Sequence, residues 1–66
     1  MAYAYTVYGS EDGIFAVCGN KKRAVEKAVA YVKNAGEEPE IRESDAWSTY
    51  VEGHRITATV ERFWIE

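Results

Sequence analysis

Few residues in this sequence are able to carry out catalysis or bind a metal. His54 is the only histidine and Cys18 the only cysteine. One imidazole and one thiol are too few soft ligands for a zinc site, and a catalytic histidine needs a carboxylate and a nucleophile within reach. We therefore predict no metal, no cofactor and no enzymatic activity. His54 is expected to be a solvated turn residue and Cys18 a buried strand residue.

One cluster of charged residues is basic and consists of Lys21, Lys22 and Arg23. Cations in the first turn of a helix oppose the helix dipole, so local helix stability does not explain them. Together with the exposed N–H groups of a helix start they form a candidate anion-binding site. The alternative is three solubilising side chains, since no glycine-rich phosphate loop precedes them.

The other charged cluster is acidic and occupies the segment 37–45. Its carboxylates lack the order of a calcium-binding loop. Spaced carboxylates can occupy a basic groove in the way that a nucleic-acid backbone does, and a solvated loop is the alternative. The candidate protein-binding carboxylates are Glu37, Glu38, Glu40, Glu43 and Asp45.

Aromatic residues make up 14% of the chain, a large supply for a small core. Adjacent strand residues face opposite sides of a sheet, so Phe63 and Trp64 cannot both lie under one helix. We expect either a bulge that resets the register or cover on both faces. Rings left exposed form a patch of the kind that associates, with a second copy or with another protein. The candidate rings are Tyr8, Trp47, Tyr50, Phe63 and Trp64.

The first half of the chain contains the elements that must position these residues. Ala2 to Tyr8 and Ile14 to Cys18 have strand-forming composition, and the glycine-flanked turn between them indicates an antiparallel hairpin. A helix is predicted from Lys21 to Ala35, with Asn20 as its N-cap and Gly36 just past its end. Its apolar residues recur with helical spacing, at Val25, Ala28, Val29 and Val32.

Two further strands are predicted in the second half, at Trp47 to Val51 and at Arg55 to Ile65, joined by a tight turn at Gly53. The long strand alternates at first, with Ala58 and Val60 facing inward. The order is therefore β-β-α-β-β. It predicts an α+β fold in which one amphipathic helix packs on one face of an antiparallel sheet.

The composition limits the class of protein. Sixty-six residues form a single domain, 1–66, and the strand-like run directly after Met1 suggests a complete small gene product. The net charge of −3 argues against a general nucleic-acid binder and is compatible with a local basic patch. No apolar run is long enough to span a membrane, and a single cysteine without a signal peptide favours the reducing cytoplasm.

The layout of a hairpin, an Asn-capped lysine-rich helix from Asn20 to Ala35 and a second hairpin resembles small accessory proteins of phages and prophages. The resemblance implies a protein partner, an inhibitory or modulatory role and a location in the host cytoplasm. It assigns no functional residue. We therefore expect a non-enzymatic protein-binding module. The alternatives are a nucleic-acid-associated protein that uses Lys21 to Arg23 with neighbouring rings, and a small enzyme or enzyme subunit.

Overall fold

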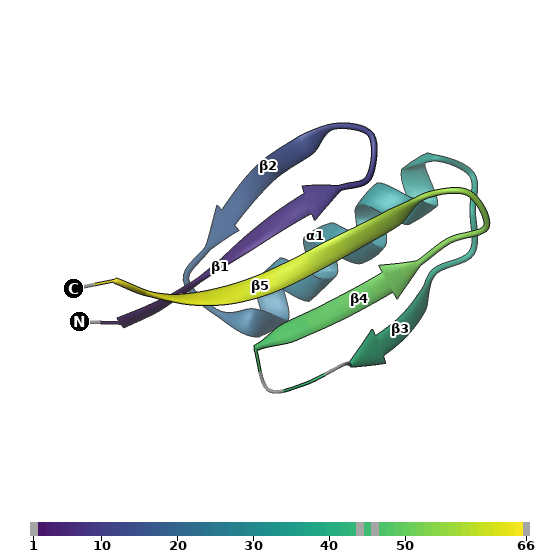
Figure 1. The fold of residues 1–66 in the computed structure, drawn as a ribbon. Coiled ribbons are helices and arrows are strands. Elements are labelled where there is room, and N and C mark those ends of the chain that lie inside the picture. Colours follow the sequence, from purple (N-terminus) through teal and green to yellow (C-terminus); the bar gives the residue numbers. More distant parts are fainter. Residues whose placement is uncertain (1, 44, 46, 66) are drawn as a thin grey trace.

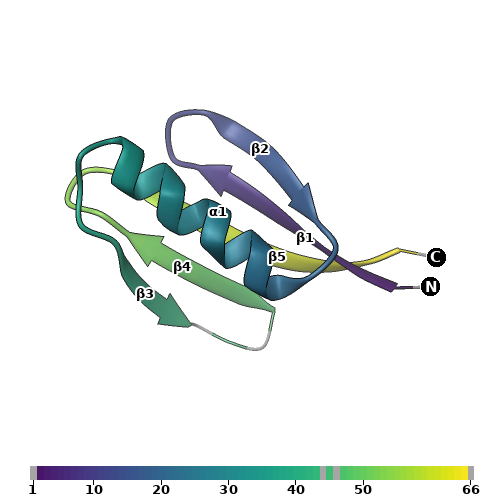
Figure 2. The same ribbon diagram turned by 180° about the vertical axis from the view of Figure 1, so that it is seen from behind.

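A computed structural model describes residues 2–43, 45 and 47–65, with the side chain of Glu43 excepted. It contains one helix and five strands (Figure 1). In chain order these are β1 (Ala2–Gly9), β2 (Gly13–Cys18), α1 (Lys21–Asn34), β3 (Glu40–Glu43), β4 (Ser48–Glu52) and β5 (Thr57–Ile65). All neighbouring strands are antiparallel, and the helix lies on one face of the sheet (Figure 2), which confirms the predicted α+β class.

The strand order across the sheet is β2-β1-β5-β4-β3, so β1 and β5 lie at its centre. The sequence predicts four strands, and the fifth is β3, which lies within the segment expected to be an acidic connector. There Ile41 pairs with Val51, and Arg42 pairs with Tyr50. Alternation of apolar and charged side chains suits an edge strand, and the run of charges concealed that pattern in the sequence.

Local hydrogen bonds define both ends of α1, as the sequence predicts. The Asn20 side-chain oxygen accepts a hydrogen bond from the N–H of Arg23 at 2.8 Å. At the other end Gly36 has a φ of +79° and donates to the Lys33 carbonyl at 2.9 Å. The N–H of Glu37 donates to the Val32 carbonyl at 3.3 Å, which completes a glycine-type helix stop.

The packed face of α1 is rotated slightly from the predicted one. Ala24, Ala28 and Val32 are fully buried, whereas Val25 and Val29 lie at the sides of the interface and are only partly buried. Small alanines at the centre let the helix approach β1 and β5 closely. The valines of the sheet that complete the core are Val7, Val51 and Val60.

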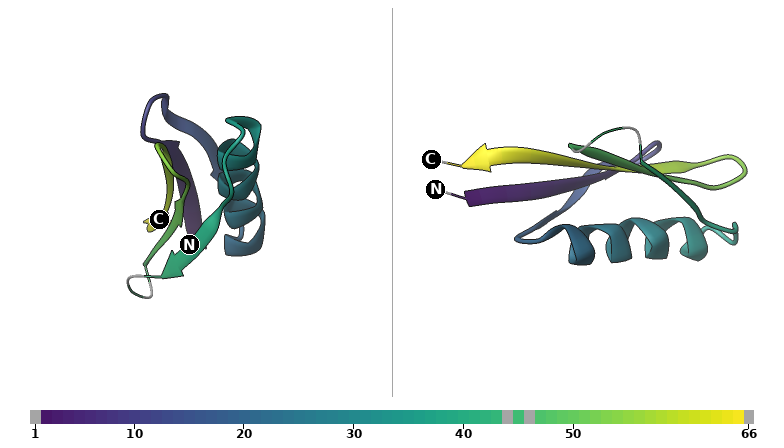
Figure 3. Two further views of the ribbon diagram at one scale, coloured as in Figure 1. Left: turned by 90° about the vertical axis from the view of Figure 1, so that its right-hand side faces the viewer. Right: turned by 90° about the horizontal axis from the view of Figure 1, so that it is seen from below.

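The end of β5 follows neither course predicted for Phe63 and Trp64. Pairing with β1 is continuous, with Ala4 opposite Phe63 and Tyr3 opposite Trp64, so no bulge resets the register there. Nor are both faces covered, because the two rings point to opposite faces and each stays about half-exposed. The reason is that β1 and β5 extend beyond the start of α1, which leaves their last residues without a helix above them (Figure 3).

Candidate functional site

Four side chains gather at the uncovered end of the sheet, on the face that carries the helix. We call Tyr3, Trp47, Arg62 and Trp64 the ring–guanidinium cluster. Tyr3 lies directly opposite Trp64 in the β1–β5 pairing, and Arg62 is two residues before Trp64 and so shares its face. Trp47 precedes β4, and its carbonyl accepts a hydrogen bond from the N–H of Arg62 at 2.8 Å.

Arg62 lies between two rings in this cluster. Its guanidinium carbon is 4.0 Å from the centre of the Tyr3 ring and 4.1 Å from that of Trp47. Trp64 completes the group through an edge-to-face contact with Tyr3. The two ring centres are 5.0 Å apart, and the interplanar angle is 71°. Both contacts of the cation are with ring faces, where the quadrupole is negative. The charge therefore attracts both rings and favours this arrangement of them.

The rings of the cluster remain accessible. Trp47 is 54% exposed, Trp64 50% and Tyr3 41%. Arg62 is half-buried, and its Nε is inaccessible and has no hydrogen-bond partner among the described residues. The rings therefore compensate its burial through cation–π contacts, and they present broad apolar surface to solvent at the same time.

The other three predicted rings lie on the opposite, open face of the sheet. Tyr8 and Tyr50 flank Thr59 from the two neighbouring strands, and Phe63 lies nearer the end of β5. Burial and a hydrogen bond with Glu61 raise the pKa of the Tyr8 hydroxyl. The five candidate rings are thus divided between two faces, two in the ring–guanidinium cluster and three on the open face.

Sequence reasoning missed Tyr3 and Arg62. The sequence did contain one sign of this cluster. Arg62 and Trp64 are two residues apart in one predicted strand, so a cation and an indole must lie on the same face of the sheet. The contribution of Tyr3 depends on the register between the first and last strands, and nothing local in the sequence specifies that register.

Glu37, one of the predicted protein-binding carboxylates, has a structural role within the fold. Its Oε1 accepts hydrogen bonds from the N–H groups of Arg55 at 2.8 Å and Ile56 at 3.2 Å. The bond from Arg55 is the main cause of a lowered pKa for this carboxyl. Glu37 therefore links the end of α1 to the turn between β4 and β5.

Other carboxylates of the segment also have partners within the chain. Glu40 pairs with Arg42 at 3.0 Å, and Arg42 also pairs with Glu52 of β4 at 3.1 Å. Asp45 accepts hydrogen bonds from the N–H of Trp47 at 2.7 Å and from that of Ser48 at 3.0 Å, which fixes the backbone beneath the Trp47 ring. These contacts distribute the carboxylates over separate sites.

The two remaining acidic candidates are Glu38 and Glu43. Glu38 is exposed beyond the helix end. The backbone of Glu43 is in β3, and its side chain lies outside the described part of the chain.

The basic residues lie at the start of α1, the end of the helix beyond which β1 and β5 extend (Figure 3). Lys22 and Arg23 are exposed, and Lys21 is half-buried. Arg23 also lines a pocket of about 170 Å³ with Cys18 and Lys27. The positive charge of this cluster therefore lies at the end of the helix from which β1 and β5 extend.

The remaining residues that could take part in catalysis or metal binding lie apart from one another. Cys18 is buried in the core and His54 is exposed in the turn before β5, as predicted. Within the described residues, no three His, Cys, Asp or Glu side chains are grouped to hold a metal ion. No helix in that part of the chain is long and apolar enough to cross a membrane.

Comparison with known proteins gives no match to a family model, a curated protein or a solved structure.

Proposed function

We propose that this chain is a non-enzymatic protein-binding module whose anchor is the ring–guanidinium cluster. The observation that carries the proposal is the grouping of Tyr3, Trp47, Arg62 and Trp64 at an uncovered end of the sheet. Tryptophan, tyrosine and arginine are the residue types that contribute most binding energy in protein interfaces. Here they form one contiguous group.

Preorganisation supports this role. Arg62 is held by Tyr3 and Trp47, and the backbone of Trp47 is tied to Asp45 and to Arg62. Side chains that are already ordered lose little conformational entropy when a partner binds. The cluster therefore suits a partner with an apolar pocket into which one or both indoles insert.

Single-stranded nucleic acid is the second candidate ligand. The specific observation in its favour is that α1, with Lys22 and Arg23 in its first turn, begins toward the end of the molecule at which β5 ends (Figure 3). The exposed ring of Trp64 belongs to that end of β5. Stacking on aromatic rings beside positive charge can hold single strands. The net charge of −3 opposes it, because phosphate binding requires a basic surface.

Inhibition of a partner's activity is a further prediction, based on the resemblance to phage accessory proteins.

Capture of partners from a host lysate tests the proposal when two matched double variants are compared. Trp47→Ala with Trp64→Ala removes the indoles of the cluster, whereas Tyr8→Ala with Phe63→Ala removes two rings of the open face. We expect the first variant to lose a protein that the wild type and the second variant both retain. Loss of that protein only in the second variant would place the site on the open face instead.

Binding of single-stranded oligonucleotides separates the two candidate ligands. For a protein-binding module, fluorescence anisotropy should show only weak binding at physiological salt. Tight binding that decreases steeply with added salt, and that is lost in Lys22→Ala with Arg23→Ala, would instead support the nucleic-acid function.

A further inference from the structure

Strand β2 is an edge of the sheet with no charged residue between Gly13 and Cys18. Ile14 and Val17 are 64% and 62% exposed. An edge strand has backbone N–H and C=O groups that no neighbouring strand occupies, and proteins usually block such edges with charged residues, prolines or bulges. β2 has a bulge at Phe15, where pairing with β1 shifts between Val7 and Tyr8. Its exposed side chains are nevertheless apolar.

The opposite edge of the sheet is protected. β3 has only four residues, and Arg42 there is paired with Glu40 and with Glu52 of β4. Charged side chains of this kind disfavour the approach of another strand. The two edges therefore differ, because β3 carries charged side chains whereas β2 has none between Gly13 and Cys18.

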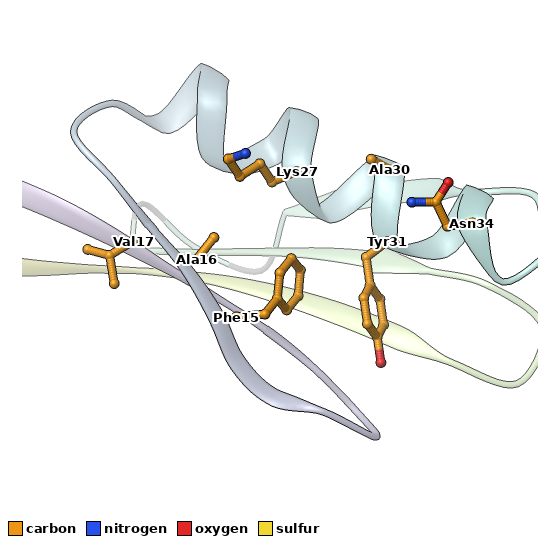
Figure 4. Close-up of a pocket in the computed structure, with 7 residues that line it drawn as sticks. All are labelled: Phe15, Ala16, Val17, Lys27, Ala30, Tyr31 and Asn34. Carbon is orange, nitrogen blue, oxygen red and sulfur yellow. The ribbon is translucent and has the colours of Figure 1, made fainter.

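A groove of about 520 Å³ runs beside this edge, between β2 and α1 (Figure 4). Its lining includes the rings of Phe15 and Tyr31, which stack with centres 4.9 Å apart at an interplanar angle of 17°. Lys27 projects from the helix above the groove, and Ala30 adds a small apolar surface. A strand added to β2 would direct alternate side chains into this groove.

The charges at the two ends of β2 have opposite signs. Glu11 and Asp12 lie in the turn before the strand, whereas Arg23 and Lys27 flank the far end, near Cys18. A second copy of the chain running antiparallel would place its acidic turn beside the basic end of the first copy. The two-fold symmetry of such a pair creates this contact twice. The β2 edge of one copy is thus complementary in charge to the β2 edge of a second, antiparallel copy.

We propose that two copies of the chain pair antiparallel through their β2 strands, which makes one continuous sheet across the dimer. The paired segment is short, and the bulge at Phe15 limits its regular part. The buried area is therefore below that of a standard stable interface, so the dimer exchanges with monomer as concentration changes. The ring–guanidinium cluster takes no part in this contact.

Sedimentation velocity over a range of concentrations tests the proposal. The wild type should shift from monomer to dimer as concentration rises. Val17→Lys adds a charge to the exposed side of β2 and should leave the protein monomeric. Ile41→Lys makes the same kind of change on the β3 edge, at a residue that is 54% exposed, and should dimerise as the wild type does.

Charge reversal tests the orientation of the two copies. Glu11→Lys alone and Arg23→Glu alone should each weaken dimerisation about tenfold, because like charges then face each other twice. An equal mixture of the two variants should dimerise again. In the mixed dimer the reversed turn of one copy, which is basic, meets the reversed helix start of the other copy, which is acidic. At the second contact the unchanged Arg23 of the first copy meets the unchanged Glu11 of the other. Arg23→Glu is compatible with the folded state because acidic residues suit the first turn of a helix.

The same measurements contain the outcomes that would overturn the proposal. These are a wild type that stays monomeric at high concentration, equal effects of Val17→Lys and Ile41→Lys, or a mixture that dimerises no better than either reversed variant. Trp64→Ala separates this proposal from the protein-binding function. It should leave dimerisation unchanged, and a loss of dimer in that variant would assign self-association to the ring–guanidinium cluster.

Discussion

Trp47 and Arg62 are joined by two interactions. The N–H of Arg62 donates a hydrogen bond to the Trp47 carbonyl at 2.8 Å, and the Arg62 guanidinium carbon lies 4.1 Å from the centre of the Trp47 ring. The first contact fixes the backbone and the second fixes the ring. Trp47 lies before the start of β4, so these contacts connect an irregular segment to the central strand β5.

Arg62→Ala should therefore release the rings of Trp47 and Tyr3. We expect the free energy of unfolding to fall by about 1 kcal/mol, the scale of partly exposed cation–π contacts. Tryptophan fluorescence should shift to the red as the indoles gain contact with water. Arg62→Lys should be intermediate, because it keeps the charge and loses the planar group that stacks on both rings. Urea unfolding that is unchanged in Arg62→Ala would show that the cluster is not held by its cation.

A close contact between Gly9 and Tyr31 gives a second prediction. The Tyr31 ring crosses Gly9 so closely that an added methyl group would overlap it. Gly9→Ala should displace the ring from its stack on Phe15 and from its hydrogen bond to Asp12, and lower the melting temperature by about 5–15 °C.

The control for this contact is the same change in a Tyr31→Ala background. There the overlap is absent, so Gly9→Ala should have little effect on the melting temperature. If Gly9→Ala is equally damaging in both backgrounds, its effect arises from the backbone and not from the ring.

The lowered pKa of Glu37 predicts how stability depends on pH. Its carboxylate accepts hydrogen bonds from Arg55 and Ile56, so folding favours the charged form. This contribution is complete above the unfolded pKa of about 4.5 and is lost as the pH falls through the lower folded value. Glu37→Gln should be less stable than wild type near pH 7 and should approach it as the pH falls through that lower folded value.

Thermal unfolding over this pH range measures the effect, with Glu38→Gln as the matched control at the exposed neighbouring residue. Glu38→Gln should follow the wild-type curve. A constant difference between Glu37→Gln and wild type at all pH values would mean that the charge of Glu37 does not stabilise the turn.

Elements that depend on local signals could be predicted from the sequence. Asn20 and Gly36 mark the helix because capping involves only neighbouring residues. The first hairpin follows in the same way from strand-forming residues around a turn. The burial of Cys18 follows from its place at the end of an apolar strand.

Features that depend on distant pairing could not be predicted. β3 forms because Ile41 meets Val51 across the sheet, and the acidic sequence around Ile41 gives no sign of that partner. The same holds for the candidate site. Trp47 and Trp64 could be named from their residue type, but Tyr3 joins them only because β1 and β5 pair in one particular register.

The central claim is that the ring–guanidinium cluster is the protein-binding surface, and one matched pair of variants tests it most directly. Trp64 and Phe63 are adjacent in β5, are similarly exposed and point to opposite faces. Isothermal titration of the captured partner should show about 30-fold weaker binding for Trp64→Ala and less than about threefold weaker binding for Phe63→Ala. Full affinity in a folded Trp64→Ala, with loss of binding in Phe63→Ala, would contradict the claim.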